Sequence, residues 1–170
     1  LTVDEYDVSA CTMPLDGYVI EGPTSAVQAI EPLLLAYDLS VRESQGKLVF
    51  FPRTSASVVA VNINDLAAHE EGSSYDRPLL LTDRPRYDLP SEVNINYMDP
   101  ELNFTKGSAS YRRSSYVRNN ISTIDIPVSL TGEQARNICK RLLMTAWAEN
   151  RHATLSLPPS YFTVEEGDLL

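Results

Sequence analysis

The stretch that decides the fold class runs from Thr131 to Glu149 and reads TGEQARNICKRLLMTAWAE. Its start fits a capping box, in which the side chains of Thr131 and Gln134 satisfy each other's exposed backbone amides. Apolar residues then recur three or four positions apart: Ala135, Ile138, Cys139, Leu142, Leu143, Ala146 and Trp147. This stripe covers about a third of a helix, as in helices that pack on a sheet. We therefore predict a helix over residues 132–149 with Cys139 on its buried side.

A second helix is predicted over residues 24–37. Thr24 follows Pro23 and can cap it, because its hydroxyl can accept from the amides of the first turn. Apolar residues follow at helical spacing: Val27, Ile30, Leu34 and Tyr37. Pro32 removes one amide donor inside this pattern, so we expect a kink or a restarted helix there.

The other patterned segments alternate with a period of two, which is typical of strands. Residues 39–51 read as a hairpin around a turn at 44–47, and residues 92–98 as a half-buried strand. Further strands are expected near 108–117, at 122–128 and at 153–157. The order of helices and strands predicts an α+β protein, in which antiparallel hairpins form small barrel-like sheets and the two helices pack against them.

A long polar connection over residues 64–90 is the best candidate for a boundary between lobes. We expect an N-terminal α+β lobe at 1–83, with a strand, a helix and a hairpin. Residues 84–170 are expected to form a β-rich lobe with the long helix, incomplete at its C-terminus. The chain begins without an initiator Met and shows no signal peptide, so we expect an excised piece of a longer polypeptide.

The charge balance excludes several classes of partner. The 170 residues include 14 Lys and Arg against 23 Asp and Glu, a formal net charge of −9. Non-specific binding to nucleic acid or to an anionic membrane needs a surplus of basic groups instead. No segment approaches the roughly 20 apolar residues that span a bilayer. We expect a soluble protein with no specific nucleic-acid binding and no membrane span.

The residues that carry most enzyme chemistry are poorly placed for it. His69 and His152 lie in unrelated contexts, and the two cysteines, Cys11 and Cys139, lack the spacing of a metal site. Phosphate-binding glycine loops and nucleophile motifs are absent. The acidic pairs at 70–71 and 165–166 lie in predicted turns, where solvated charge is the simplest explanation. We predict no catalytic residue, no cofactor and no metal, and the scarcity of cysteine favours synthesis in a reducing compartment.

One segment runs against the overall charge. Residues 103–118 contain four basic residues, no acidic residue, and three interleaved aromatic residues. Tyr and Arg dominate the binding energy of many protein interfaces. The alternatives are a plain exposed strand face, or a site for single-stranded nucleic acid or sugar. The candidate interface residues are Lys106, Tyr111, Arg112, Arg113, Tyr116 and Arg118.

Three stretches in a fixed order suggest a family. The first is PLDGYVIE at 14–21, and the second is residues 93–100 followed by Phe104 and residues 111–113. The third is AWAE at 146–149, followed by LSLPPSY at 155–161 and EEGD at 165–168. Together they resemble part of the phage tail protein family, the host-specificity or tail-hub proteins of siphophage-like particles and gene transfer agents. The resemblance runs from about Leu15 to Asp168.

The resemblance implies a structural role. Proteins of this family form a hub at the tail tip, usually a trimer with small β-barrel and α+β lobes around a central channel. It implies a longer full-length protein, a place in the virion tail tip, and contacts with other tail-tip or baseplate proteins and with the host surface. In some relatives a separate part of the chain resembles a glycoside-hydrolase barrel, which lies outside these residues. The alternatives are a soluble glycan- or cell-wall-binding module and, third, an enzyme acting on peptidoglycan.

Overall fold

The computed structural model describes residues 3–20, 22–55, 58–66, 72, 79–114 and 120–170. The chain divides into two compact units that interleave in sequence. The helix–sheet unit contains Met13–Leu39 and Arg84–Asn150, and the hairpin unit contains Leu1–Thr12, Ser40–Asp83 and Arg151–Leu170. The division into lobes at 1–83 and 84–170 stays a prediction.

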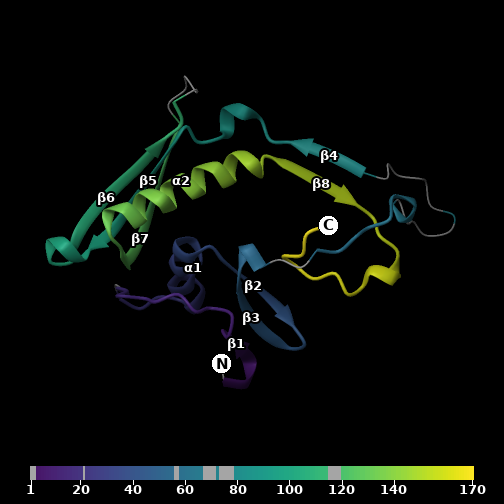
Figure 1. Cartoon of the computed structure of the whole chain (residues 1–170), viewed down its shortest axis with the longest axis horizontal. Coiled ribbons are helices and arrows are strands. Elements are labelled where there is room, and N and C mark those ends of the chain that lie inside the picture. Colours follow the sequence, from purple (N-terminus) through teal and green to yellow (C-terminus); the bar gives the residue numbers. More distant parts are fainter. Residues whose placement is uncertain (1–2, 21, 56–57, 67–71, 73–78, 115–119) are drawn as a thin grey trace. The chain divides into compact units, whose positions relative to one another are not determined.

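The helix–sheet unit is built on a three-stranded sheet with the order β6-β5-β7. The central strand β5 (Glu92–Asp99) pairs antiparallel with β6 (Thr105–Arg112) and parallel with β7 (Ile121–Ser129). Helix α2 (Gly132–Ala148) lies along one face of β5 and β6 (Figure 1), and α1 (Ala26–Tyr37) contacts β7.

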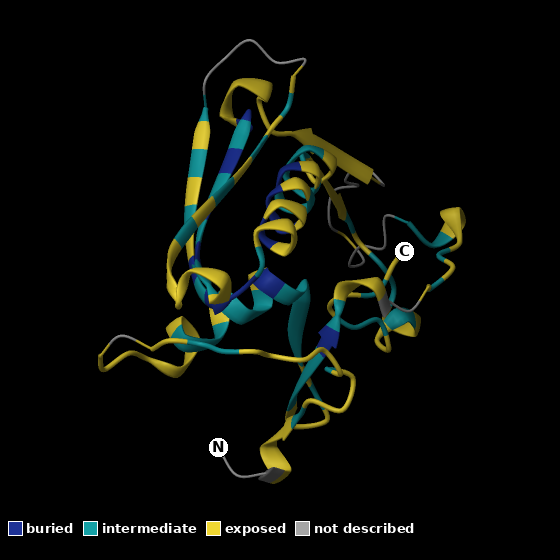
Figure 2. Ribbon diagram, turned by 60° about the vertical axis from the view of Figure 1, so that its left-hand side comes forward, coloured by how far each residue is buried: buried dark blue, intermediate teal, exposed yellow. Residues whose placement is uncertain are grey.

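The core of this unit lies between the sheet and α2. Side chains of a strand alternate between its two faces, and β5 buries Val93, Ile95 and Tyr97 on the side of the helix. Figure 2 shows buried residues along β5 and on one side of α2. The helix contributes Ala135, Ile138, Cys139 and Leu143, and β7 with the residue after it contributes Ile126, Val128 and Leu130. The stripe predicted on α2 is therefore its packing face, with Cys139 buried as expected.

The ends of the helices test the capping predictions. Thr131 caps α2 and forms the predicted capping box with Gln134. The predicted cap of α1 at Thr24 is wrong by one residue, because Ser25 forms the capping box with Gln28 and the helix begins at Ala26.

Helix α1 runs through Pro32 without a restart. The missing donor is tolerated, because the second half of the helix buries Ala36 and packs Leu33 and Tyr37 against the core. Arg141 of α2 adds hydrogen bonds to the backbone oxygens of Leu35 and Ala36, so a basic side chain satisfies carbonyls at the end of α1.

The hairpin unit contains the predicted hairpin of β2 (Leu39–Ser44) and β3 (Lys47–Pro52), although Leu39 itself belongs to the other unit. The connecting residues Gln45 and Gly46 both have positive φ, which suits the tight turn of a hairpin. The short strand β1 (Tyr6–Asp7) pairs parallel with β3.

Strands β4 (Leu79–Asp83) and β8 (Arg151–Leu155) form a separate two-stranded antiparallel sheet in the same unit. The sequence placed β4 inside a polar connection, because its partner lies far along the chain. Strand β8 begins two residues before the strand expected at 153–157. Short 3-10 turns occupy Val3–Glu5, Arg53–Ser55, Ile63–Asp65, Arg86–Asp88, Pro100–Leu102 and Pro159–Tyr161.

The predicted α+β class with two helices is confirmed. In the described parts of the chain, the sheets are open and none closes into a barrel. Each has two or three strands, too few for the tilt and stagger that close a barrel.

Candidate interaction surfaces

The residues of the predicted basic interface fall on different sides of the sheet. Gly107, Ala109 and Tyr111 of β6 are half-buried on the side of α2, and Ala109 and Tyr111 pack against the core. Lys106 and Arg112 are exposed on the opposite face, one near each end of β6. The structure therefore brings Lys106 and Arg112 to one face and separates them from Tyr111.

Arg113, the residue after β6, is also outside this exposed face. Its guanidinium lies 4.2 Å from the centre of the Trp147 ring, and its backbone amide donates to the Ser91 oxygen at 2.9 Å. An arginine over an aromatic face stabilises by cation–π attraction, so Arg113 has a structural role here. Tyr116 and Arg118 lie outside the described residues. The interface itself stays a prediction.

The sheet face opposite α2 contains polar residues that the sequence patterns did not single out. Asn96 Nδ2 of β5 donates to Asp125 Oδ1 of β7 at 2.8 Å. These two residues, with Met98 and Lys106, line part of a depression of about 310 Å³. The alternation of β5 was the available signal, since it places Asn94, Asn96 and Met98 on the face opposite the core.

A second depression, of about 680 Å³, lies beside the edge of the sheet. Ser108 and Ser110 of β6 line it on one side, and Glu133, Arg136 and Asn137 of α2 on the other. Its lining is polar and combines a carboxylate, a guanidinium, an amide and two hydroxyls. Such a surface is suited to hydrogen bonding with a polar chain rather than to holding an apolar ligand.

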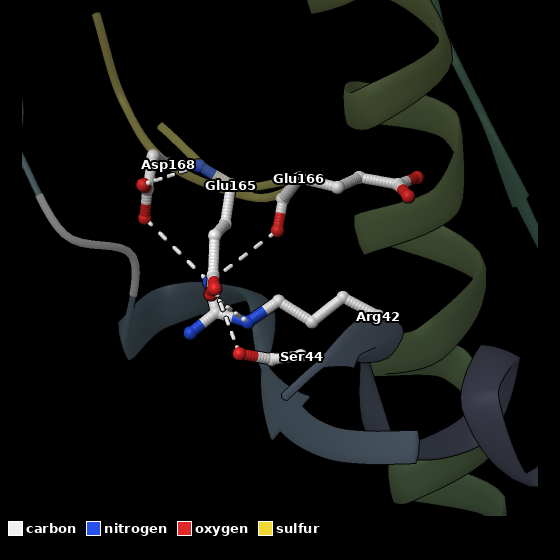
Figure 3. Close-up of polar contacts among 5 residues, drawn as sticks. All are labelled: Arg42, Ser44, Glu165, Glu166 and Asp168. Atoms are coloured by element: carbon white, nitrogen blue, oxygen red, sulfur yellow. Dashed lines mark hydrogen bonds and ion pairs between the residues drawn. The ribbon is translucent and has the colours of Figure 1, made fainter. Parts of the chain in front are cut away.

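In the hairpin unit, Arg42 of β2 is the centre of an ionic cluster with the residues near the C-terminus (Figure 3). Its Nε lies 3.1 Å from Glu165 Oε2, and its Nη1 lies 3.7 Å from Asp168 Oδ1. Ser44 Oγ donates to Glu165 Oε1 at 2.7 Å, and the backbone amide of Glu165 donates to Asp168 Oδ2 at 3.0 Å. We call these four residues the Arg42 clasp.

The interpretation of the pair 165–166 as solvated charge is wrong for Glu165. Only 8% of the Asp168 side chain and 39% of the Glu165 side chain are exposed, and both carboxylates form ion pairs with Arg42. Glu166 is exposed, and its backbone oxygen accepts from Arg42 Nη1 at 3.5 Å. The clasp joins groups far apart in sequence, so no local pattern could reveal it. The other acidic pair, at 70–71, falls outside the described residues.

Phe51 and Gly167 complete the packing around the clasp. The guanidinium of Arg42 lies 5.0 Å from the centre of the Phe51 ring. Gly167 has φ +97°, and a Cβ built on it would lie 2.6 Å from Phe51 Cζ. Only glycine fits this conformation and this close approach. The predicted turn at EEGD therefore has a specific packing role.

The β4–β8 ribbon presents apolar side chains to solvent. Leu79, Leu80 and Leu81 are all exposed, and successive residues of a strand point to opposite faces. At one end of the ribbon an ion pair joins the two strands, with Arg151 Nε 2.6 Å from Asp83 Oδ1. Exposed apolar side chains on both faces of a ribbon are typical of protein-contact surfaces.

The thiols show no features of a reactive site. Cys139 Sγ donates to the Ala109 oxygen at 3.3 Å, and burial raises its pKa. Cys11 is half-buried, and its pKa is raised by burial and by the charge of Asp7. A raised pKa disfavours the thiolate, which is the reactive form. In the described segments no group of three or more His, Cys, Asp and Glu residues could hold a metal ion.

Comparison with known families resolves the class of protein. The family model described as "Putative phage tail protein" matches residues 25–170. The chain belongs to this family. The resemblance noted in the sequence is thereby confirmed, and the chain is a phage tail protein. No curated protein sequence matches it.

Two solved structures are similar to this phage tail protein. A chain in the virion of a native gene transfer agent particle superposes with a TM-score of 0.87 at 24% identity, over 98% of this chain and 37% of that one. The prophage tail protein gp18 from Listeria monocytogenes EGD-e matches with a TM-score of 0.37 at 18% identity, over 80% of this chain and 40% of that one. The first similarity shows that the fold is shared. This chain spans little more than a third of the length of that virion protein.

Two further observations concern the described residues of this phage tail protein. No described helix is long and apolar enough to cross a membrane. The charged groups of the Arg42 clasp and the stacked Arg113 are engaged within the protein. The exposed faces left for contacts include the polar face of β5–β6–β7, the edge of β6 and the β4–β8 ribbon.

Proposed function

We propose that this chain is a structural part of the hub at the tip of a phage-like tail, where it takes part in tail assembly and in host attachment or delivery. The observation that carries the proposal is the family match over residues 25–170. The fold shared with a gene transfer agent virion chain over 98% of this chain supports it. The order of stretches typical of tail-hub proteins supports the tip rather than the tail tube.

The proposed role is assembly rather than catalysis. In the described residues, the most elaborate group of charged side chains is the Arg42 clasp, and its geometry is that of a structural contact. Within the clasp, Glu165 and Asp168 are both bound to Arg42, and such polar contacts fix the course of the chain. The exposed Leu79, Leu80 and Leu81 of β4 favour contacts with other proteins.

The proposed partners follow from this role. They are other tail-tip or baseplate proteins, further copies of the same polypeptide in a homotrimer, and the host cell surface. Symmetric assemblies of this kind need surfaces of complementary character. The proposed location is the tail tip of the particle, after synthesis in the bacterial cytoplasm.

Immunogold labelling of particles with antibody raised to this chain tests the proposal. We expect gold at one end of the tail, and pre-immune serum serves as the control. Gold along the whole tube would contradict the tip position. Particles without gold, when the antigen is present in the lysate, would contradict a virion role. They would favour the cell-wall-binding alternative, and retention of the chain on purified cell walls would then test that alternative.

A further inference from the structure

Strand β6 forms one edge of its sheet. It pairs with β5 along all eight of its residues, in a regular register from Thr105 opposite Asp99 to Arg112 opposite Glu92. The ladder has no bulge, and the strand contains no proline. Bulges and prolines are two of the devices by which natural edge strands prevent another strand from pairing with them.

The hydrogen-bonding phase of β6 identifies the groups at this edge. The Arg113 amide donates to the Ser91 oxygen. Ser91 and Arg113, which follow the last pair of β5 and β6 (Glu92 opposite Arg112), are therefore a hydrogen-bonded pair. Hydrogen-bonded pairs alternate along an antiparallel ladder. The odd-numbered residues of β6 therefore bond to β5, and Ser108 and Ser110 direct their N–H and C=O groups away from it. Within the described residues, no backbone group pairs with these two serines.

Both charged side chains of β6 itself are basic, whereas Glu133 of α2 lines the depression beside the edge and Glu92 of β5 lies opposite Arg112. Lys106 and Arg112 flank the two serines on the exposed face, and residues 103–114 include no acidic residue. The chain as a whole has a net charge of −9, so β6 is a basic strand in an acidic protein. A strand with carboxylates near its ends is complementary to it, since opposite charges on facing strands stabilise their pairing.

A second copy of β6 is a poor match for the same edge. In the antiparallel register that places Ser108 of one copy opposite Ser110 of the other, Lys106 of one strand would lie opposite Arg112 of the other. Like charges directly opposite each other on paired strands are destabilising. The charge pattern therefore favours a strand of different sequence.

The depression beside the edge leaves room for the partner's side chains. It lies between Ser108 and Ser110 on one side and Glu133, Arg136 and Asn137 of α2 on the other, with a volume of about 680 Å³. Alternate side chains of an added strand would enter it. Its lining would accept hydrogen-bonding side chains such as Thr, Ser or Asn.

We propose that β6 is a docking edge for an extended acidic segment of another tail polypeptide, which adds a strand antiparallel to β6. Backbone hydrogen bonds to Ser108 and Ser110 supply the affinity, and Lys106 and Arg112 select carboxylates near the ends of the added strand. The binding mode stands on the geometry of β6, and only the source of the partner rests on the proposed tail function.

The test uses a fluorescent peptide of alternating Thr and Val, as long as β6, with Glu near each end. Its binding to the chain is measured by anisotropy for Ser110→Pro and Ser110→Ala. Proline removes the outward N–H, and alanine keeps it. Proline is tolerated on an edge strand where the N–H faces solvent, so both variants should fold, which circular dichroism verifies. We expect the proline variant to bind about 10-fold more weakly than the alanine variant.

Amide exchange measured by NMR on the unmodified chain gives an independent readout. The peptide should slow exchange at Ser108 and Ser110 and leave Ala109 unchanged, because Ala109 already bonds to β5. Four outcomes would each overturn the proposal. Two concern the variants and the exchange: equal binding of the peptide by the two Ser110 variants, or exchange that changes uniformly along β6. The other two concern the peptide: no binding at all, or tighter binding when Lys replaces Glu. Self-association of the chain that Ser110→Pro abolishes would overturn the choice of partner. Immunogold labelling is unaffected by these outcomes, so the two proposals fail separately.

Discussion

Different interactions stabilise the interior of the two units of this tail protein: apolar burial in the helix–sheet unit and polar contacts in the hairpin unit. Among the described residues, every buried apolar residue except Phe51 belongs to the helix–sheet unit. There, α2 covers β5 and β6 over a continuous apolar core. In the hairpin unit, the Arg42 clasp holds the segment near the C-terminus on β2, and the two-stranded β4–β8 ribbon leaves its leucines exposed.

This difference predicts different responses to solution conditions. Apolar burial contributes roughly 25 cal/mol per Å² and is insensitive to moderate salt. Partly exposed ion pairs contribute less and are screened by salt. The helix–sheet unit should therefore be the stable part of the chain, and the hairpin unit the part that opens first. Trp147, the single tryptophan, reports on the first unit, and Cys11 reports on the second.

The largest effect is expected from Leu143→Ala. Leu143 is fully buried between α2 and the sheet, so its truncation leaves a cavity in the core. We expect a loss of about 3 kcal/mol in the free energy of unfolding, measured by urea titration of Trp147 fluorescence. Leu80→Ala, in the exposed ribbon, is the control and should leave the same transition unchanged. Equal losses from the two variants would contradict the difference between the units.

A smaller effect, confined to the hairpin unit, is expected from Gly167→Ala. The added Cβ meets the Phe51 ring, and the residue has positive φ. We expect a cost of about 2 kcal/mol in the opening of this unit, seen as faster alkylation of Cys11. Gly46→Ala has a similar positive φ but open space around its Cβ, so it isolates the contact with Phe51. A Gly167→Ala variant that alkylates no faster than Gly46→Ala would show that the contact is unimportant.

Arg42→Met tests the clasp itself. It leaves Asp168, of which only 8% of the side chain is exposed, without its arginine. Because Arg42 and Glu165 are partly exposed, we discount the effect to about 1 kcal/mol, with a smaller difference from the unmodified chain at high salt. Arg151→Met breaks an ion pair that is exposed on both sides and should have no measurable effect. The readout is again the alkylation rate of Cys11, and a salt-independent effect would contradict the ionic explanation.

The smallest effect in the helix–sheet unit is expected from Thr131→Ala. Thr131 Oγ1 accepts from the Gln134 amide at the start of α2. Loss of this cap should cost about 1 kcal/mol in the Trp147 transition. Thr145 lies within the same helix and caps neither end, so Thr145→Ala should cause no comparable loss. Two similar losses would mean that the cap contributes little.

The features predicted from the sequence are those coded locally. The capping box at Thr131, the stripe of α2 and the alternation of β5 each depend on neighbouring residues, and each appears in the structure as expected. The same alternation, applied to β6, would have separated Lys106 from Tyr111, whereas the basic segment was treated as one surface.

The features that were missed depend on pairing across the chain. The sequence predicts a connection where the structure has β4, because only its pairing with β8 makes it a strand. The sequence around Glu165 predicts a solvated charge, because its partner Arg42 lies far away in the sequence. The hairpin unit consists largely of such distant contacts, and the helix–sheet unit has strong local signals. Sequence analysis was therefore more successful for the unit with the larger core.

The difference between the units is tested most directly by following both reporters in one urea titration. Cys11 alkylation and Trp147 fluorescence are measured on the same samples of the unmodified chain. We predict that Cys11 becomes fully reactive at a lower urea concentration than the midpoint of the Trp147 transition, and that added salt lowers only the Cys11 midpoint. Coincident transitions with the same salt dependence would show a single cooperative unit and would contradict this account.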